Sequence, residues 1–101
     1  MKYKIEILSS AWEDLKKIQD YYLIQFDLRT AMKVSDHILS TIERLEDFPD
    51  SGTMTPDPWL NEQGYRMVIS KRHVAIYRRV KDMIYIYHID DTQTEYTKLF
   101  Y

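Results

Sequence analysis

The stretch that decides the fold is Tyr65–Ile89, YRMVISKRHVAIYRRVKDMIYIYHI, which is dense in β-branched and aromatic residues. Such residues fit the pleated, half-buried surface of a sheet. Polar breaks at Ser70-Lys71-Arg72 and Lys81-Asp82 divide the stretch into three expected strands, residues 65–69, 73–80 and 83–89. Connections this short join antiparallel neighbours, so the three strands are predicted to form a meander.

Two amphipathic helices are predicted upstream of the meander. The pattern Ser10-Ala11-Trp12-Glu13 fits a capping box at the start of the first helix. The second helix spans about residues 29–47, and only residues 26–28 separate the two, so they are expected to be antiparallel neighbours. Apolar residues recur at helical spacing in both, at Ala11, Leu15, Ile18 and Tyr22 and then at Ala31, Val34, Ile38, Ile42 and Leu45.

The order of elements predicts the fold class. Residues 3–8 alternate between apolar and charged side chains, as a short strand does. The resulting order, β-α-α-β-β-β, predicts a single compact α+β domain over residues 1–101, with the helical hairpin packed on an antiparallel sheet. Residues 49–64 hold all three prolines and both glycines, and are expected to form one long loop that is either mobile or used for binding.

The composition excludes several classes of protein. The chain has no cysteine, which excludes disulfides and thiolate chemistry, and no apolar run approaches the roughly 20 residues that span a bilayer. With no apolar secretory stretch at the start, a cytoplasmic protein without a membrane partner is expected. Two glycines cannot build a P-loop or a dinucleotide fingerprint. We expect no cofactor and no metal, because the three histidines lie far apart in the sequence, at His37, His73 and His88.

The net charge of −2 conceals a strong asymmetry. Residues 63–81 carry +6 and the rest of the chain carries −8. A positive surface on an acidic body is expected where phosphate or an acidic protein docks. The alternative is a solvated hairpin whose cations only keep an edge strand soluble. The six cations are Arg66, Lys71, Arg72, Arg78, Arg79 and Lys81.

Strand alternation predicts which side chains share a face. Arg66 and Val68 share a face of their strand, and Ala75, Tyr77 and Arg79 follow His73 on one face of the next. Val74, Ile76 and Arg78 take the opposite face. The face left free by the helices is expected to present cations beside tyrosines, which suits single-stranded RNA, although most tyrosines in a sheet simply pack.

Metal-free cleavage of RNA requires a base, an acid and cations that hold the charge developing on phosphate. Arginines supply the last of these, and His73, His88, Lys71 and the tyrosines are the groups that offer the first two. The ordinary alternative for His88 is a hydrogen-bonded residue at the rim of the core. His37 is expected to be a solvated residue on the flank of the second helix.

Three stretches, taken in order, also resemble a known family. They are AWEDLKKIQDYY (residues 11–22), IERLEDFPDSG (residues 42–52) and the strand region from Gly64 through HVAIYR (residues 73–78) to TQTEY (residues 92–96). In this order they are similar to the RelE/ParE superfamily of toxins from type II toxin–antitoxin systems, also called plasmid stabilisation proteins. The resemblance implies the fold predicted above and a cognate antitoxin protein that covers the working surface.

The resemblance implies one of two activities. RelE-like members inhibit translation by cutting mRNA in the ribosomal A site, with basic residues on the sheet and a C-terminal tyrosine or histidine. ParE-like members inhibit DNA gyrase and cleave nothing. Arg66 falls on a basic position of the RelE-like strand and Tyr96 near the C-terminal tyrosine, but Val74 and Gln93 stand where RelE-like toxins carry arginines. One phosphate-contacting donor is typically worth about 3–4 kcal/mol in the transition state.

These observations give two sets of candidate residues and three candidate functions. The functions are a metal-independent, ribosome-dependent mRNA endoribonuclease, a ParE-like inhibitor of gyrase, and a decayed relative without toxicity. Arg72, Arg78 and Arg79 are candidate substitutes for the two missing arginines. The catalytic candidates are Arg66, His73, His88 and Tyr96, and the candidates for binding RNA or another target are Lys71, Arg72, Arg78, Arg79 and Lys81.

Overall fold

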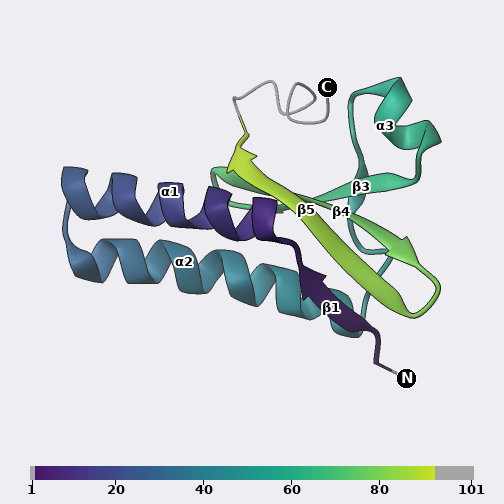
Figure 1. The fold of residues 1–101 in the computed structure, drawn as a ribbon, viewed down its shortest axis with the longest axis horizontal. Helices are drawn as coiled ribbons and strands as arrows, with labels where there is room; N and C mark the ends of the chain where they lie inside the picture. Colours follow the sequence, from purple (N-terminus) through teal and green to yellow (C-terminus); the bar gives the residue numbers. More distant parts are fainter. Residues whose placement is uncertain (1, 93–101) are drawn as a thin grey trace.

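The computed structural model describes residues 2–92, and the meander predicted from Tyr65 onward forms the middle of its sheet (Figure 1). The strands β3 (Tyr65–Ser70), β4 (His73–Val80) and β5 (Met83–Asp91) pair antiparallel through two-residue turns. The two predicted helices are α1 (Ser9–Gln25) and α2 (Leu28–Glu43), and a short 3-10 turn, η1 (Arg44–Glu46), follows α2. The predicted α+β class and the helical hairpin are therefore confirmed.

The sheet is mixed, whereas an antiparallel sheet was predicted. Its strand order is β1-β5-β4-β3-β2, and β1 (Lys4–Ile7) runs parallel to β5, with Lys4 opposite Met83 and Ile7 opposite Ile86. Antiparallel pairing is dictated only where a short turn joins two strands. Between β1 and β5 lie both helices and the other strands, so their relative direction is set by packing and leaves no local signal.

The segment predicted to be one long loop contains two elements. The first is β2 (Thr53–Met54), which pairs with β3, and the second is the helix α3 (Pro58–Glu62). Asp57 caps α3 by accepting a hydrogen bond from the Leu60 amide at 3.1 Å, and Pro58 occupies the first turn. Proline at the start of a helix after an aspartate cap is a common helix signal, which the density of prolines concealed.

The start of α1 covers part of the edge of β5. The predicted capping box is wrong, because Leu8 is the N-cap and makes no side-chain cap. The Ser10 hydroxyl instead donates to the Tyr87 carbonyl at 2.6 Å, and Asp14 accepts from the Ile89 amide at 3.1 Å. Since β1 pairs only with residues 83–86, these bonds satisfy groups on β5 that another strand would otherwise satisfy.

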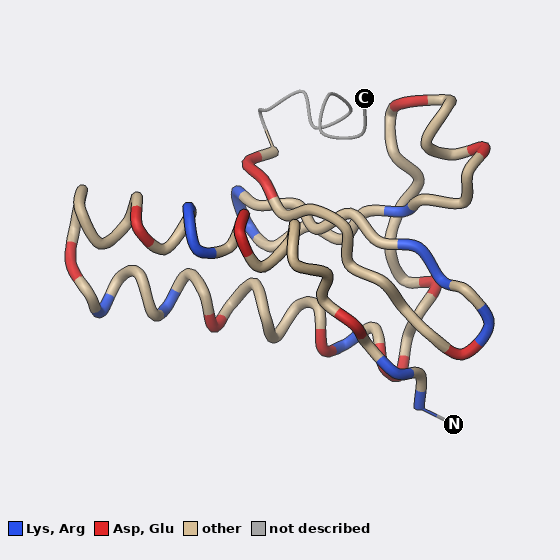
Figure 2. Tube along the Cα trace, viewed as in Figure 1, with Lys and Arg blue, Asp and Glu red and all other residues tan. Residues whose placement is uncertain are grey.

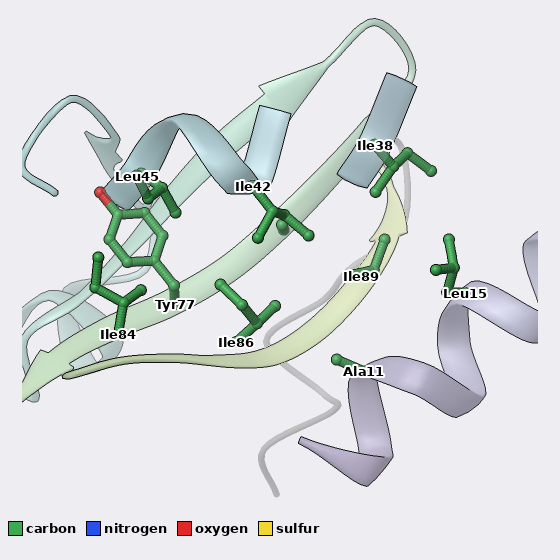
Figure 3. Close-up of a cluster of buried hydrophobic side chains, with 10 residues drawn as sticks. Ala11, Leu15, Ile38, Ile42, Leu45, Tyr77, Ile84, Ile86 and Ile89 are labelled. Atoms are coloured by element: carbon green, nitrogen blue, oxygen red, sulfur yellow. The ribbon is translucent and has the colours of Figure 1, made fainter. Parts of the chain in front are cut away.

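The main core lies between the sheet and the helical hairpin (Figure 3). Ala75 and Tyr77, which the alternation places on one face of β4, face the helices. A second, smaller cluster lies on the opposite face, where Leu60 of α3 packs on Val74 and Ile76. The face predicted to be free is therefore partly covered. The main cluster comprises Ala11, Leu15, Ile38, Ile42, Leu45, Ala75, Tyr77, Ile84, Ile86 and Ile89.

The helical hairpin extends well beyond the strands (Figure 1). Its free end is apolar and exposed, and Ile24 is 77% exposed. We call this set the hairpin tip: Tyr21, Leu23, Ile24, Phe26, Leu28 and Met32. None of the helices in residues 2–92 has the length and apolar character needed to cross a bilayer.

Candidate functional site

The fold divides the six cations of residues 63–81 into separate groups. Lys71 and Arg72 lie in the turn between β3 and β4, whereas Lys81 lies in the turn between β4 and β5. The eight residues of β4 separate these turns by roughly 23 Å. Figure 2 accordingly shows Lys and Arg at both ends of the sheet. The predicted single cationic patch does not form.

Arg66 and Arg79 lie on the helix side of the sheet and contact the segment that follows η1. The Arg66 guanidinium donates to the Gly52 carbonyl at 3.1 Å. The Arg79 guanidinium lies 3.4 Å from Asp50 Oδ2 and 3.2 Å from the Tyr3 hydroxyl. Both arginines thus bind groups of the protein itself.

The Tyr77 hydroxyl fixes the same segment from inside the core. It donates to the Pro49 carbonyl at 2.9 Å and accepts from the Gly52 amide at 3.0 Å. Burial raises the pKa of Tyr77 above its ordinary value, while the hydrogen bond from Gly52 and the charge of Arg66 oppose this rise. The hydroxyl therefore stays protonated and serves as a structural anchor.

Arg78 lies on the opposite face of the sheet, between two aromatic rings. Its guanidinium carbon is 5.3 Å from the Tyr65 ring centre and 5.7 Å from the Tyr87 ring centre. Its Nη1 lies 3.5 Å from the Gln63 carbonyl. Burial also raises the pKa of Tyr65. The predicted placement of a cation beside tyrosines on this face is confirmed for Arg78.

The β3–β4 turn and the helical hairpin enclose two adjoining cavities. We call the first, of about 150 Å³, the turn cavity. The second, of about 370 Å³, lies against α1 and shares Tyr22, Arg72 and His73 with the first. The turn cavity is lined by Tyr22, Lys33, Val34, His37, Ser70, Lys71, Arg72 and His73. The second cavity is lined in addition by Asp14, Lys17, Ile18, Tyr21, Ile89, Asp90 and Asp91.

His73 lies between the two cavities and is only 7% exposed. Its ring meets that of Tyr22 edge to face, with 5.9 Å between the centres. Burial lowers the pKa of His73 below its ordinary value of 6.5, Asp91 and Asp90 act to raise it, and Arg72 acts to lower it further. The neutral imidazole is therefore the favoured form in the folded protein.

This shift predicts a pH-dependent contribution to stability. Because the unfolded chain binds a proton at His73 more readily, the contribution is fully present above pH 6.5 and is lost as the pH falls through the lowered pKa of the folded state. In that window the free energy of unfolding should fall by at most about 1.4 kcal/mol per pH unit. Urea unfolding from pH 7.5 to 5 measures it, and His73→Phe should abolish this part of the slope. An unchanged slope would contradict the assignment.

The other two histidines each connect a helix to the sheet. His88 Nδ1 lies 2.8 Å from Asp14 Oδ2, and this hydrogen bond holds the ring of β5 against α1. His37 is exposed, as predicted, but its Nδ1 lies 2.8 Å from the Ser70 hydroxyl. Among residues 2–92, no three acidic or histidine side chains gather where they could hold a metal ion.

Sequence reasoning named five of the residues that line the turn cavity in no candidate site: Tyr22, Lys33, Val34, His37 and Ser70. Lys33 and His37 are one helical turn apart, and this spacing places them on the same side of α2. That signal was available in the sequence. The packing of this side of α2 against the β3–β4 turn was not, because it joins segments far apart in the chain.

The family of the chain follows from its match to a family model. Residues 5–96 match the model described as the ParE toxin of the type II toxin–antitoxin system parDE. The chain belongs to the ParE toxin family. A comparison with curated proteins finds no match.

Two solved structures share the fold of this ParE-family chain. One is described as the chromosomal ParDE toxin–antitoxin system from P. aeruginosa, with a TM-score of 0.78, 21% identity, and 91% of this chain and 98% of that chain covered. The other is the toxin–antitoxin complex RelBE2 from Mycobacterium tuberculosis, with a TM-score of 0.59, 15% identity, and coverage of 90% and 99%. At these identities the likeness concerns the fold alone.

The structure also places one of the two positions at which this chain departs from RelE-like toxins. Val74 is 1% exposed and packs with Leu60, so in this ParE-family chain the position belongs to the second core cluster. Gln93 and the catalytic candidate Tyr96 lie outside the described residues. The catalytic and binding assignments made from the sequence remain predictions.

Proposed function

We propose that this ParE-family chain is a toxin that inhibits DNA gyrase by binding it, without cleaving nucleic acid, and that a cognate antitoxin protein holds it inactive. The observation that carries the proposal is the dispersal of the candidate catalytic groups. Among the catalytic candidates within residues 2–92, Arg66 binds the Gly52 carbonyl and lies opposite Tyr77 of β4, four residues along that strand from His73, while His88 binds Asp14. General acid–base cleavage requires its groups within hydrogen-bond reach of one substrate, and this arrangement disfavours it.

The hairpin tip supports a protein partner. An exposed cluster of large apolar side chains is typical of a surface that another protein covers. The tip carries Ile24, Phe26 and Leu28 around the connection between α1 and α2, each more than 60% exposed. The two structures of similar fold are both toxin–antitoxin systems, which favours an antitoxin as the protein that covers the tip here.

The test uses the purified full chain with purified gyrase and relaxed plasmid DNA. We expect the chain to block ATP-dependent supercoiling at a near-stoichiometric ratio to gyrase. Prior addition of the cognate antitoxin should restore supercoiling. In a translation extract, the same amount of toxin should leave mRNA intact by primer extension.

The opposite pattern would overturn the proposal. Breaks at A-site spacing in translated mRNA, with normal supercoiling, would identify a ribosome-dependent endoribonuclease. In that case Arg66→Ala would decide whether Arg66 takes part in cleavage. Normal growth on induction without antitoxin, with the chain folded and present, would identify a non-toxic relative.

A further inference from the structure

The turn cavity shares no residue with the hairpin tip. Three of its eight lining residues are cationic: Lys33 from α2, and Lys71 and Arg72 from the β3–β4 turn. None of the eight is Asp or Glu. We propose that the turn cavity binds a single phosphate group, held by these three cations.

The size of the cavity favours one anionic group over a whole nucleotide. Sites for drug-sized ligands usually have volumes of about 300–1,000 Å³. At about 150 Å³ the turn cavity is too small for a base and a sugar together, but it accommodates a phosphate. The remainder of such a ligand would lie outside, on the side of Arg72 and His73, where the second cavity adjoins.

The charges of two of the cations are available to a ligand. Within residues 2–92, neither Lys33 nor Lys71 forms an ion pair with an acidic side chain. Arg72 has an acidic neighbour, since its Nη2 lies 3.5 Å from Asp91 Oδ2, and this contact is exposed to solvent. Lysine contributes a point charge to phosphate and arginine a fork of donors, so the set suits a doubly charged anion.

The backbone of Lys71, set by its two-residue hairpin turn, has a counterpart outside the cavity. Lys71 has a φ of 56°, in the left-handed region that favours glycine. Lys81 holds the equivalent first position of the β4–β5 turn with a φ of 58°, yet it lines neither of the two cavities. The two lysines share a backbone geometry and differ in surroundings, which provides a matched pair of variants.

The test is an NMR titration of the full ¹⁵N-labelled chain with inorganic phosphate, with ionic strength held constant by chloride. We expect saturable shifts of the amides of residues 70–73 and of the His37 and His73 rings. Lys71→Gly should raise the dissociation constant about tenfold, as expected for the loss of one charged contact. Lys81→Gly removes the same charge at the same backbone geometry, and should leave the dissociation constant unchanged.

Both variants place glycine where the backbone favours it, so both should fold. Shifts that follow chloride equally well, that centre elsewhere on the chain, or that respond alike to the two variants would overturn the proposal. Lys33→Met provides a second loss of charge from α2, and its failure to weaken binding would count against the proposal too.

Titrations with further ligands distinguish which class of phosphorylated molecule the turn cavity binds. A short single-stranded oligonucleotide with a 5′-phosphate is compared with its unphosphorylated form and with adenosine 5′-monophosphate. Preference for the phosphorylated oligonucleotide over the monophosphate indicates a nucleic-acid terminus, and equal binding indicates a small phosphorylated ligand. This proposal and gyrase inhibition can fail separately. The NMR titration measures only the binding of phosphate, whereas the supercoiling assay measures only the inhibition of gyrase.

Discussion

Gly52→Ala should lower the free energy of unfolding by about 3 kcal/mol, since it combines overpacking with the loss of a buried hydrogen bond. A Cβ at residue 52 would lie 2.6 Å from a ring carbon of Tyr77, 2.8 Å from the Met67 carbonyl oxygen and closer still to the Tyr77 hydroxyl. The Tyr77 ring is fully buried between Leu45 and Ile84, so it has no room to withdraw (Figure 3). Urea unfolding monitored by circular dichroism measures the loss.

Ser51→Ala is the matched control for this prediction. Ser51 adjoins Gly52 but is exposed, and its substitution should change stability by no more than about 0.5 kcal/mol. Tyr77→Phe separates the two components, because it removes only the hydroxyl that binds Pro49 and Gly52, and it should cost about 1–3 kcal/mol. If Gly52→Ala proved as mild as Ser51→Ala, the close contact at Tyr77 would be wrong.

Ile24→Lys should weaken the binding of the antitoxin by about 30-fold or more, which corresponds to the 2 kcal/mol typical of an interface hot spot. Ile24 is the most exposed of the large apolar side chains, and a lysine there would place a charge within the apolar tip. The folded chain should keep its stability, because the side chain contributes little to the core and a cation is favourable near the end of α1. Calorimetric titration with the purified antitoxin measures the affinity.

Gln25→Lys is the control for charge. It introduces the same positive charge at the next residue of α1, which is also exposed, but it removes no apolar side chain. An antitoxin that binds both variants as tightly as it binds the unaltered chain would show that it covers another surface. The supercoiling assay provides an independent measure. The antitoxin should restore supercoiling poorly when gyrase is inhibited by the Ile24→Lys variant.

Local signals predicted most of the fold. Two signals are local to a single element: the density of β-branched residues in the last three strands, and the helical spacing of apolar residues such as Ala11 and Leu15 in α1 and Ile38 in α2. These strands and helices formed where the patterns indicated. The parallel pairing of β1 with β5 was not predicted, because it joins residues nearly eighty positions apart and depends on the packing of everything between them. The helix α3 was hidden by the expectation that prolines mark a loop.

The candidate site was predicted less well, for a related reason. The sequence groups Lys71, Arg72, Arg78 and Arg79 by their closeness along the chain. A strand turns neighbouring side chains to opposite faces and carries its ends far apart, so Arg78 and Arg79 separate although they are adjacent. The turn cavity depends on Lys33 and His37, which reach the β3–β4 turn only through the packing of α2 on the sheet.

The short outer strands have a consequence for the chain when it is on its own. In residues 2–92, β1 offers four residues at one border of the sheet and β2 offers two at the other, where β3 pairs with β2 only at Arg66 and Met67, while α1 bonds to the part of β5 beyond β1. An unpaired strand is a template for cross-β assembly, and its hazard grows with its length. The chain on its own therefore presents only short runs of unpaired strand backbone on which amyloid-like polymers could nucleate, and self-association through side chains of the exposed helices is the greater risk to its solubility.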